Sequence, residues 1–493
     1  APVTKINLNV SGGGKTSTYN VSGSYLNQKG IVKTTGYEAW NIRTKNTFSA
    51  FNNHLRMGTS VLLKMWNKDY DDLSYSSALR NLTMVPVYDT NNPKDGRWGY
   101  VPSWGKGADN PVGWVESHDN QRHGIDLLMN GYAEVDLGLE GLKYKFNVGA
   151  ERLQRRSYAH STPFYFGPYS EQNVNKLSEG HTWDNTWMIE NTLHYDNTFG
   201  KHTVSGLLGY SSQRYSYRSI SASREGLTDG IFVLDNGASD TQTNGGSAAA
   251  NTLVSLFARG MYSFDSRYMV SASVRRDGSS KFADGHRYGV FPSASVGWNI
   301  MNEQFFEKAK ETVNELKLRV SYGTLGNLNG VGNYATQSVV NSGYNAVQGG
   351  SWWLGATTGA SWVSPEDLTW EKTKTFNVGT DVAILNNKLS LTADYFIQRT
   401  EGLLLGINQP GSSGMSGTPT YNAATVENKG VEISLNHRNT VGELYYHVGV
   451  NLSAIKNNLK EITTPTRQEF TGYTPHDKGY ITWAKVGKSI GSF

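Results

Sequence analysis

The sequence predicts an all-β protein, an antiparallel β-barrel whose strands cross a membrane. Three observations support this prediction. Apolar residues recur at every second position in many segments, and the connections between these segments alternate between short and long. The composition is also typical of β-structure with many turns, since it contains 54 Gly, 28 Tyr and 13 Trp but only 13 Pro. Period-two alternation indicates strands with one apolar and one polar face.

The clearest strand pair is predicted between residues 267 and 306. The sequence Asp-Gly-Ser-Ser at 277–280 supplies a turn, because glycine tolerates positive φ and aspartate bonds to its own backbone. Every second residue on either side of this turn is apolar, which predicts a long antiparallel hairpin. The apolar positions are Tyr268, Val270, Ala272, Val274, Tyr288, Val290, Pro292, Ala294, Val296, Trp298 and Ile300.

The same alternation predicts further strands in order along the chain. We expect them near residues 6–10, 19–25, 55–65, 135–139, 142–148, 316–322, 389–397 and 444–452. A soluble β-sandwich also alternates in this way, so period two alone establishes only half-buried strands.

The connections favour a membrane barrel over a sandwich or a propeller. Outer-membrane barrels have short periplasmic turns at one rim and long extracellular loops at the other. Here the predicted short links are 12–17, 51–53, 140–141, 197–201, 265–266, 386–388 and 439–442, and the long stretches are 67–124, 157–182, 217–251, 323–369, 401–424 and 456–481. One short-side link, 301–315, is longer, and its apolar spacing predicts a short amphipathic helix.

Composition excludes several other classes. A net charge of +4 is too near neutral to favour nucleic acid as a partner. Cysteine is absent, so disulfides and thiolate metal sites are excluded. The mean hydropathy of −0.50 does not argue against a membrane barrel, because only alternate residues of its strands face lipid. We find no Gly-x-Ser-x-Gly elbow and no His-Glu-x-x-His pattern, and we expect no enzyme activity, cofactor or metal site.

The hairpin at 267–306 resembles the barrel core of SusC/RagA-type TonB-dependent transporters. The similar segments are RDGSSKF at 276–282, RYGVFPS at 287–293, Gly-Trp at 297–298 and EQFF at 303–306, and weaker similarities continue in order along almost the whole chain. The resemblance implies a multi-pass barrel in the outer membrane of a Gram-negative, Bacteroidetes-like bacterium.

The resemblance also implies that residues 1–493 are one barrel domain and a partial one. We count about 16–17 strands, against about 22 in plugged transporters. An N-terminal plug, a TonB-contacting segment and the last strands are expected outside this chain, because an unclosed barrel would leave unpaired backbone groups in lipid. The chain begins at Ala1 without the pattern of a signal peptide, so we expect a processed protein or a piece of a longer one.

The function implied by the resemblance is active import of a nutrient. We expect oligosaccharide uptake by a SusC–SusD-type complex driven by TonB, with a SusD-like surface lipoprotein as the lid and a dimer of SusC–SusD pairs as the assembly. Two alternatives stay open: peptide import of the RagA type, and a passive porin or adhesion barrel.

Tryptophans in two long loops are the candidate substrate-binding residues. Flat rings beside carboxylate and amide groups suit sugars, because a ring covers the CH face while polar neighbours bond the hydroxyls. Packing within the loop, a membrane girdle or contact with a partner protein would explain the same rings equally well. The candidates are Trp98 and Trp104 with Asp95 and Arg97, and Trp352 and Trp353 with Asn345.

Alternation also predicts which way each strand residue points. The expected lipid-facing residues are Tyr288, Ala294, Val296, Leu318, Val320, Leu391 and Val448, and the expected lumen-facing residues are Arg287, Ser295, Lys317, Arg319 and Asp394. The loops 67–124 and 323–369 are expected on the extracellular side, where at least one covers the mouth or contacts a partner.

Overall fold

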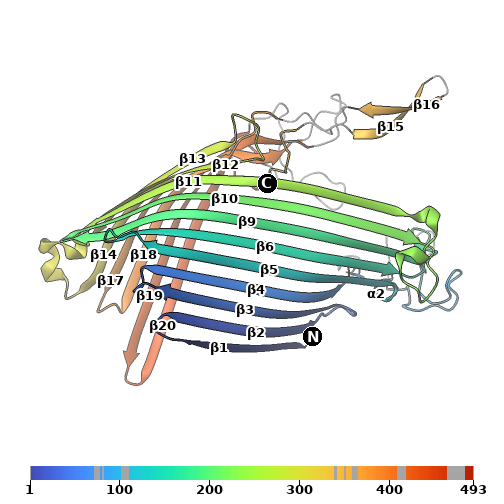
Figure 1. Ribbon diagram of the computed structural model, residues 1–493, viewed down its shortest axis with the longest axis horizontal. Helices are drawn as coiled ribbons and strands as arrows, with labels where there is room; N and C mark the ends of the chain where they lie inside the picture. Colours follow the sequence, from blue (N-terminus) through green and yellow to red (C-terminus); the bar gives the residue numbers. More distant parts are fainter. Residues whose placement is uncertain are drawn as a thin grey trace. The chain divides into compact units, whose positions relative to one another are not determined.

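A computed structural model describes the chain except for residues 1, 72–77, 80–82, 102–109, 338–340, 349–350, 358–364, 408–417, 463–483 and 492–493. Sixteen strands form one sheet, in which each strand pairs with the next along the chain (Figure 1). These strands are β1 (Val3–Gly13), β2 (Ser17–Lys29), β3 (Gly36–Ala50), β4 (Leu55–Tyr70), β5 (His118–Asp136), β6 (Leu142–Ser161), β9 (Lys176–Phe199), β10 (His202–Glu225), β11 (Thr243–Phe264), β12 (Tyr268–Ser279), β13 (Tyr288–Asn299), β14 (Val313–Asn327), β17 (Glu371–Ile384), β18 (Leu389–Gly406), β19 (Thr420–Val441) and β20 (Leu444–Ile462). The predicted all-β antiparallel fold is therefore confirmed.

The remaining elements lie in the connections. The hairpins β7 (Phe164–Gly167)–β8 (Ser170–Gln172) and β15 (Asn341–Gln348)–β16 (Ser351–Thr357) form separate two-stranded sheets. The short helices are α2 (Pro111–Ser117), η1 (Leu234–Asn236), η2 (Ser239–Thr241), η3 (Ile300–Asn302) and η4 (Gln304–Ala309). In the described part of the chain, none of the helices has the length and apolar character needed to cross a membrane.

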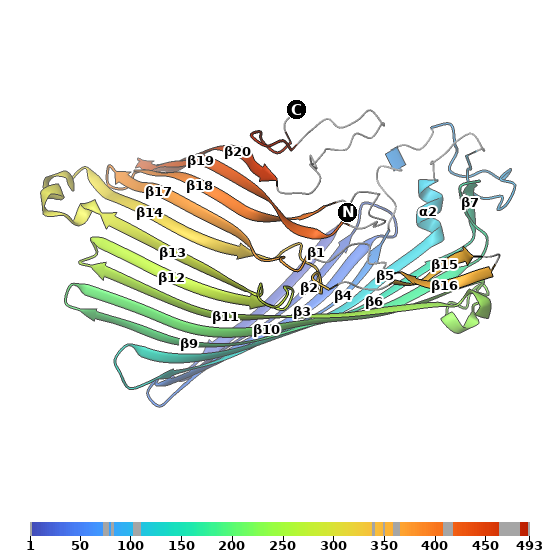
Figure 2. The same cartoon turned by 90° about the horizontal axis from the view of Figure 1, so that it is seen from above.

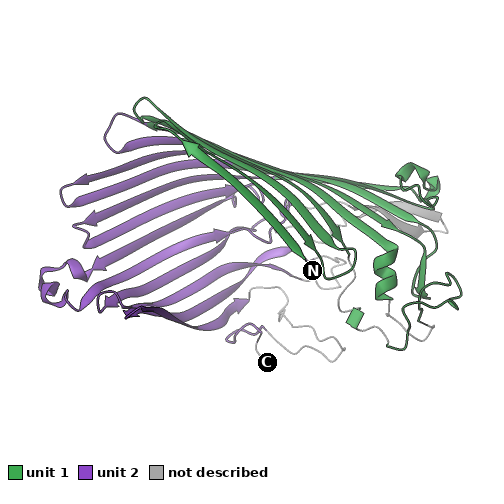
Figure 3. Cartoon of the chain, turned by 90° about the horizontal axis from the view of Figure 1, so that it is seen from below, with its two compact units in different colours: residues 1–135, 146–189, 213–250 green, residues 136–145, 190–212, 251–493 purple. Residues whose placement is uncertain are grey.

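The chain divides into two compact units (Figure 3). Unit 1 comprises residues 1–135, 146–189 and 213–250, and unit 2 comprises residues 136–145, 190–212 and 251–493. Within unit 2 the strands β12, β13, β14, β17, β18, β19 and β20 follow one another in chain order (Figure 2). Each unit therefore consists mainly of adjacent antiparallel strands.

Short and long connections alternate as predicted. On one side of the strands the turns are tight and use the left-handed backbone region: Phe51, Asn52 and Asn53 have φ of 51°, 53° and 69°, and Gly200 has φ of 59°. On the other side the connections run, for example, from Tyr70 to His118 and from Asn327 to Glu371. The short helix predicted in the 301–315 link is present, in the form of the 3₁₀ helices η3 and η4.

The strands are longer than the sequence indicated. β9 and β10 have 24 residues each, whereas about 9–11 residues suffice to cross a bilayer. Strand structure therefore continues through parts of the stretches predicted as loops at 157–182 and 217–251. We infer that the strands extend past the membrane on the long-loop side.

The two faces of the strands separate as the alternation predicted. In unit 2 one cross-strand row is apolar, and its residues are between 41% and 54% exposed: Val270, Val296, Val320, Val378, Tyr395 and Val431. The next row, on the opposite face, is polar: Ser271, Ser295, Ser321 and Asn377. We call these the apolar face and the polar face.

The other predicted positions follow the same division. Tyr288, Ala294, Leu318, Leu391 and Val448 have the strand parity of the apolar face, and Lys317, Arg319 and Asp394 that of the polar face. Leu391 is half-buried in a row with Leu435 and Val450. Arg287 precedes β13 and forms an ion pair with Asp284 at 2.9 Å, so its lumenal orientation stays a prediction.

A single carboxylate joins the ends of two strands, β12 and β13, and the β11–β12 turn at the tight-turn rim of unit 2. Glu303, which is 8% exposed, accepts hydrogen bonds from Tyr268 Oη at 2.5 Å and Trp298 Nε1 at 3.1 Å. Arg267 donates to Glu303 at 3.3 Å and also pairs with Asp265. The link after β13 is thereby fixed against the β11–β12 turn, which explains why this longer connection is ordered.

The orientation of the faces can be tested with neighbouring lysine substitutions. Val296→Lys places a charge on the apolar face, and in a bilayer it should lower the unfolding free energy by roughly 2–4 kcal/mol near the midplane. Ser295→Lys on the polar face is the matched control and should change it by less than about 1 kcal/mol. Denaturant unfolding of the full-length protein in lipid vesicles measures the unfolding free energy of both variants. Equal losses for the two variants would contradict the assignment of faces.

Candidate functional site

In unit 1 the long β4–β5 connection folds into a compact cluster with the β7–β8 hairpin. Its core consists of Trp98, Phe164 and Phe166, which are 1%, 7% and 0% exposed. The rings of Phe164 and Phe166 stack with their centroids 4.5 Å apart, and Trp98 meets Phe166 edge-on at 6.5 Å. We call residues 85–101, 110–117 and 164–172 the loop cluster.

Buried amide side chains hold the backbone of the loop cluster. Asn92 Nδ2 donates to the carbonyl oxygens of Trp98 at 2.7 Å and Tyr165 at 3.0 Å. Asn110 Nδ2 donates to the Val87 carbonyl at 2.7 Å, and its Oδ1 caps the start of α2. These bonds satisfy backbone groups that a long loop would otherwise leave unpaired, so this part of the loop has a defined structure.

The predicted site residues of this loop act within the cluster. Trp98 is buried beneath Tyr88, with ring centroids 5.4 Å apart, so the expectation of an exposed ring at this position is corrected in favour of loop packing. Asp95 accepts from the backbone N–H groups of Arg97 and Trp98 through Oδ1, and from that of Tyr165 through Oδ2. Arg97 lies over the Trp98 ring at 4.2 Å and pairs with Glu116. Ligand contact by Asp95 and Arg97 stays a prediction.

The remaining predicted site residues are Trp104 and three residues of the β15–β16 hairpin. Trp104 lies outside the described residues. Trp352 and Trp353 lie on β16 opposite Val347 and Ala346, and Asn345 lies on β15 opposite Leu354. The sequence did not predict that this segment forms a hairpin, because the long 323–369 stretch gave no clear alternation.

The polar face of unit 2 carries a hydroxyl and ionic surface. Ser271 and Ser295 are joined through their hydroxyls at 2.7 Å. Arg319 donates to Asp381 at 2.8 Å and to Asp394 at 3.3 Å, which bridges β14, β17 and β18. A groove of about 510 Å³ lies along this surface, and its lining includes Arg259, Lys317, Arg319, Ser321 and Asn377.

Unit 1 has a similar polar face. The ion pairs Lys64–Asp126 at 3.8 Å and Arg56–Glu134 at 3.0 Å link β4 to β5. A groove of about 570 Å³ there is lined by residues that include Arg43, Asn130, Glu151, Thr186 and Gln213. Both polar faces therefore offer hydrogen-bonding groups to a hydrophilic solute. Within the described ranges, no three His, Asp or Glu residues lie close enough together to hold a metal ion.

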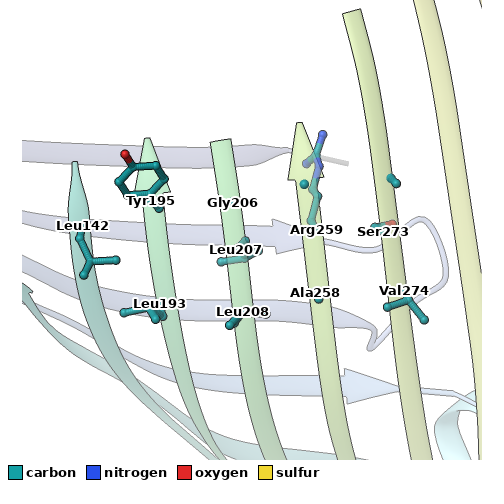
Figure 4. Close-up of a pocket in the computed structure, with 12 residues that line it drawn as sticks. Leu142, Leu193, Tyr195, Gly206, Leu207, Leu208, Ala258, Arg259, Ser273 and Val274 are labelled. Carbon is teal, nitrogen blue, oxygen red and sulfur yellow. The ribbon is translucent and has the colours of Figure 1, made fainter. Parts of the chain in front are cut away.

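A third groove belongs to the apolar face of unit 2 (Figure 4). It has a volume of about 480 Å³, and Leu142, Leu193, Leu208 and Val274 border it, while Gly206, Ala258, Gly260 and Ala272 leave it shallow. Because Leu208 and Val274 are 58% and 44% exposed, this groove lies on the face assigned to lipid. It is not a candidate for a hydrophilic substrate.

A buried histidine lies under the β10–β11 connection of unit 1. His160 is 6% exposed, and its ring centroid is 3.9 Å from that of Phe232. Asn175 donates to the Leu227 carbonyl at 3.1 Å and to Asp229 at 2.6 Å, which holds the same connection in place. Burial lowers the pKa of His160, although the nearby carboxylates of Asp119 and Asp229 act in the opposite direction.

The sequence of this chain matches a known family. The family described as TonB dependent receptor-like, beta-barrel, matches residues 65–487. The chain belongs to this family. TonB-dependent receptor P39 of Formosa agariphila is 30% identical over 480 residues, and the alignment covers 95% of this chain and 44% of that protein.

Two further similarities agree with this receptor family. TonB-dependent receptor SusC of Bacteroides thetaiotaomicron is 26% identical over 481 residues, which are 92% of this chain and 47% of that protein. The solved RagAB peptide transporter has a TM-score of 0.83 at 23% identity, with coverage of 99% of this chain and 54% of that one, and it shows the shared fold. The chain thus spans about half the length of these relatives, and the predicted SusC/RagA-type barrel is confirmed.

The packing role of Trp98 can be tested by truncation. Trp98→Ala should destabilise the loop cluster by about 3–5 kcal/mol, because it removes a fully buried aromatic ring. Limited proteolysis of the full-length receptor should then cleave the β4–β5 connection much faster than in the unchanged protein. Arg97→Ala is the control and should change the cleavage rate little. Unchanged protection of Trp98→Ala would show that the ring is not required for packing.

The lowered pKa of His160 predicts a pH effect on the β10–β11 connection. Above the unfolded pKa of about 6.5 the imidazole is neutral in both states and packing is fully stable. As the pH falls below that value, the unfolded segment gains a proton more readily, so the packed state loses stability. Hydrogen exchange of residues 226–242, corrected for intrinsic rates, should therefore increase from pH 7.5 to pH 5. His160→Phe keeps a neutral ring and should abolish the increase.

Proposed function

We propose that this chain is the barrel of an outer-membrane importer driven by TonB. The observation that carries the proposal is the separation of an apolar face from a hydroxyl and ionic face on strands joined alternately by short and long connections. Such strands are suited to face lipid on one side and a hydrophilic passage on the other. Membership of the TonB-dependent receptor family supports energised import over a passive porin.

We propose oligosaccharides as the imported substrates. The support is the tryptophan-rich sequence of the long connections, at Trp104 and at the Trp352–Trp353 pair near Asn345. Hydroxyl and amide groups on the polar face of unit 2, including Ser271, Ser295 and Asn377, are also suited to solutes rich in hydroxyl groups. Trp98 is buried within the loop cluster, so it does not support oligosaccharide binding.

Peptide import is the second candidate. It is favoured by the similarity of the backbone to the RagAB peptide transporter over 99% of this chain. A peptide would be bound through backbone pairing and mixed pockets and would not require ring platforms. The two candidates therefore differ in their dependence on the loop tryptophans.

The partners of the importer belong to the same proposal. By likeness to SusC, we propose a SusD-like surface lipoprotein over the long-connection side, TonB on the tight-turn side, and an assembly of two SusC–SusD pairs in the outer membrane. The loop cluster is a suitable contact surface for a lipoprotein, because its internal hydrogen bonds fix it before any partner binds.

The substrate class can be decided with the complete complex. Trp104→Ala and the Trp352→Ala, Trp353→Ala double variant should each weaken glycan binding by about 1–3 kcal/mol per stacking ring, or roughly one to two decades in Kd. Trp187→Ala, at a half-exposed ring on strand β9 rather than in a long connection, is the control and should leave affinity unchanged. Calorimetry with glycans and with peptides measures the affinity of each variant for both classes of substrate.

The outcomes separate the candidates. Binding of peptides alone, or glycan affinity that is the same in every variant, would contradict oligosaccharide import through these rings. Uptake that continues at the full rate in cells without TonB would contradict energised import and favour a passive barrel.

A further inference from the structure

Basic side chains collect at one end of the apolar face of unit 2. They lie on the long-connection side of five strands, β12, β17, β18, β19 and β20. The residues are Arg276, Lys372, Lys374, Arg399, Lys429, Lys456 and Lys460, and the glutamates among them are Glu401 and Glu427. We call this set the basic belt.

Strand parity places the belt on the apolar face. Lys374 is two residues from the exposed Phe376, and Lys429 is two residues from the exposed Val431. Arg276 lies opposite Val290, which is 50% exposed, and its guanidinium is 4.0 Å from the centroid of the Tyr288 ring. The belt is therefore an outward-facing surface rather than part of the polar face.

Ion pairs within and between strands show that these side chains share one surface. Lys374 Nζ lies 2.6 Å and Arg399 Nε 3.4 Å from Glu401. Lys429 and Lys460 pair with Glu427 at 3.3 Å and 3.1 Å. Each glutamate thus neutralises part of the charge of two basic residues, and the belt as a whole keeps a positive excess.

The belt lies about one membrane thickness from the tight turns. Arg399 and Lys374 are each about ten residues along their strands from the β17–β18 turn, which is the length of strand that crosses a bilayer. The opposite end of the same face has aromatic residues instead: Tyr268 pairs with Trp298, and His437 packs near Tyr446 at 5.4 Å. An aromatic end suits a zwitterionic interface, whereas a basic end suits an anionic one.

We propose that the basic belt binds the phosphate groups of a phosphorylated glycolipid, lipid A, in the outer leaflet. The inference rests on the proposed function, because it requires the apolar face to contact the bilayer with its long connections outside. Lysine and arginine form strong charge-assisted hydrogen bonds to phosphate, and adjacent acyl chains would lie on the valine row below the belt. A phosphate-bearing lipid therefore matches both the charge and the apolar surface.

The test uses the full-length receptor, purified in detergent, and a triple variant, Arg276→Gln, Lys372→Gln and Lys456→Gln. These three substitutions leave the four ion pairs of the belt in place. Native mass spectrometry during titration with diphosphorylated lipid A should show roughly tenfold weaker binding by the variant. Dephosphorylated lipid A should bind weakly and equally to both proteins. A matched triple variant on the polar face, Lys45→Gln, Arg259→Gln and Lys317→Gln, should bind lipid A as the unchanged receptor does.

Each other outcome contradicts the proposal. Equal lipid A binding by the belt variant and the unchanged receptor would show that the belt does not bind phosphate. Phosphatidylglycerol that binds as tightly as lipid A would show a general anionic surface rather than a glycolipid site. Fractionation of cells tests the proposed function separately, since a receptor absent from the outer membrane would overturn that function, whereas a receptor present there without lipid A binding would overturn only this inference.

Discussion

Backbone hydrogen bonding in lipid is the constraint on which the rest of the structure depends. In hydrocarbon every N–H and C=O group must find a partner within the protein, and strands meet this requirement by pairing side by side. Each of the sixteen strands pairs with its chain neighbour. With the backbone pairing fixed, each side chain can point only to one face or the other. The opposite character of Val296 and Ser295 is a direct result.

Outside lipid, backbone groups can also bond to water or to side chains. The short and the long connections pair their backbone groups in different ways. On the tight-turn side the backbone reverses within a few residues by using left-handed conformations, as at Asp265 and Ser266. On the long-connection side, buried amides such as those of Asn92 and Asn110 donate hydrogen bonds to the carbonyl groups of the loop backbone. In these loops, side-chain amides satisfy the backbone hydrogen-bonding groups that strand pairing satisfies in the sheet.

Much of the fold could be predicted from the sequence because its pattern is local. The alternation around Val270 and Val296 is determined by adjacent residues and is confirmed. The turn predicted at 277–280 is wrong in position, because Asp277 and Gly278 pair within the hairpin and the connection runs from 280 to 287. The burial of Trp98 depends on Phe166, which is distant in sequence, so a sequence pattern could not distinguish a packing ring from an exposed one. The extension of β9 and β10 was missed because strands outside lipid no longer need strict alternation.

The carboxylate of Glu303 has a mechanical consequence. It ties together the ends of β12 and β13 and the link that follows them, through Tyr268, Trp298 and Arg267. A force applied to this link is therefore shared among neighbouring strands instead of peeling one strand from the sheet edge. Hydrogen bonds loaded together in shear resist far more force than bonds broken one after another. The buried carboxylate of Glu303 and its three donors thus distribute force over two strands and the turn beside them.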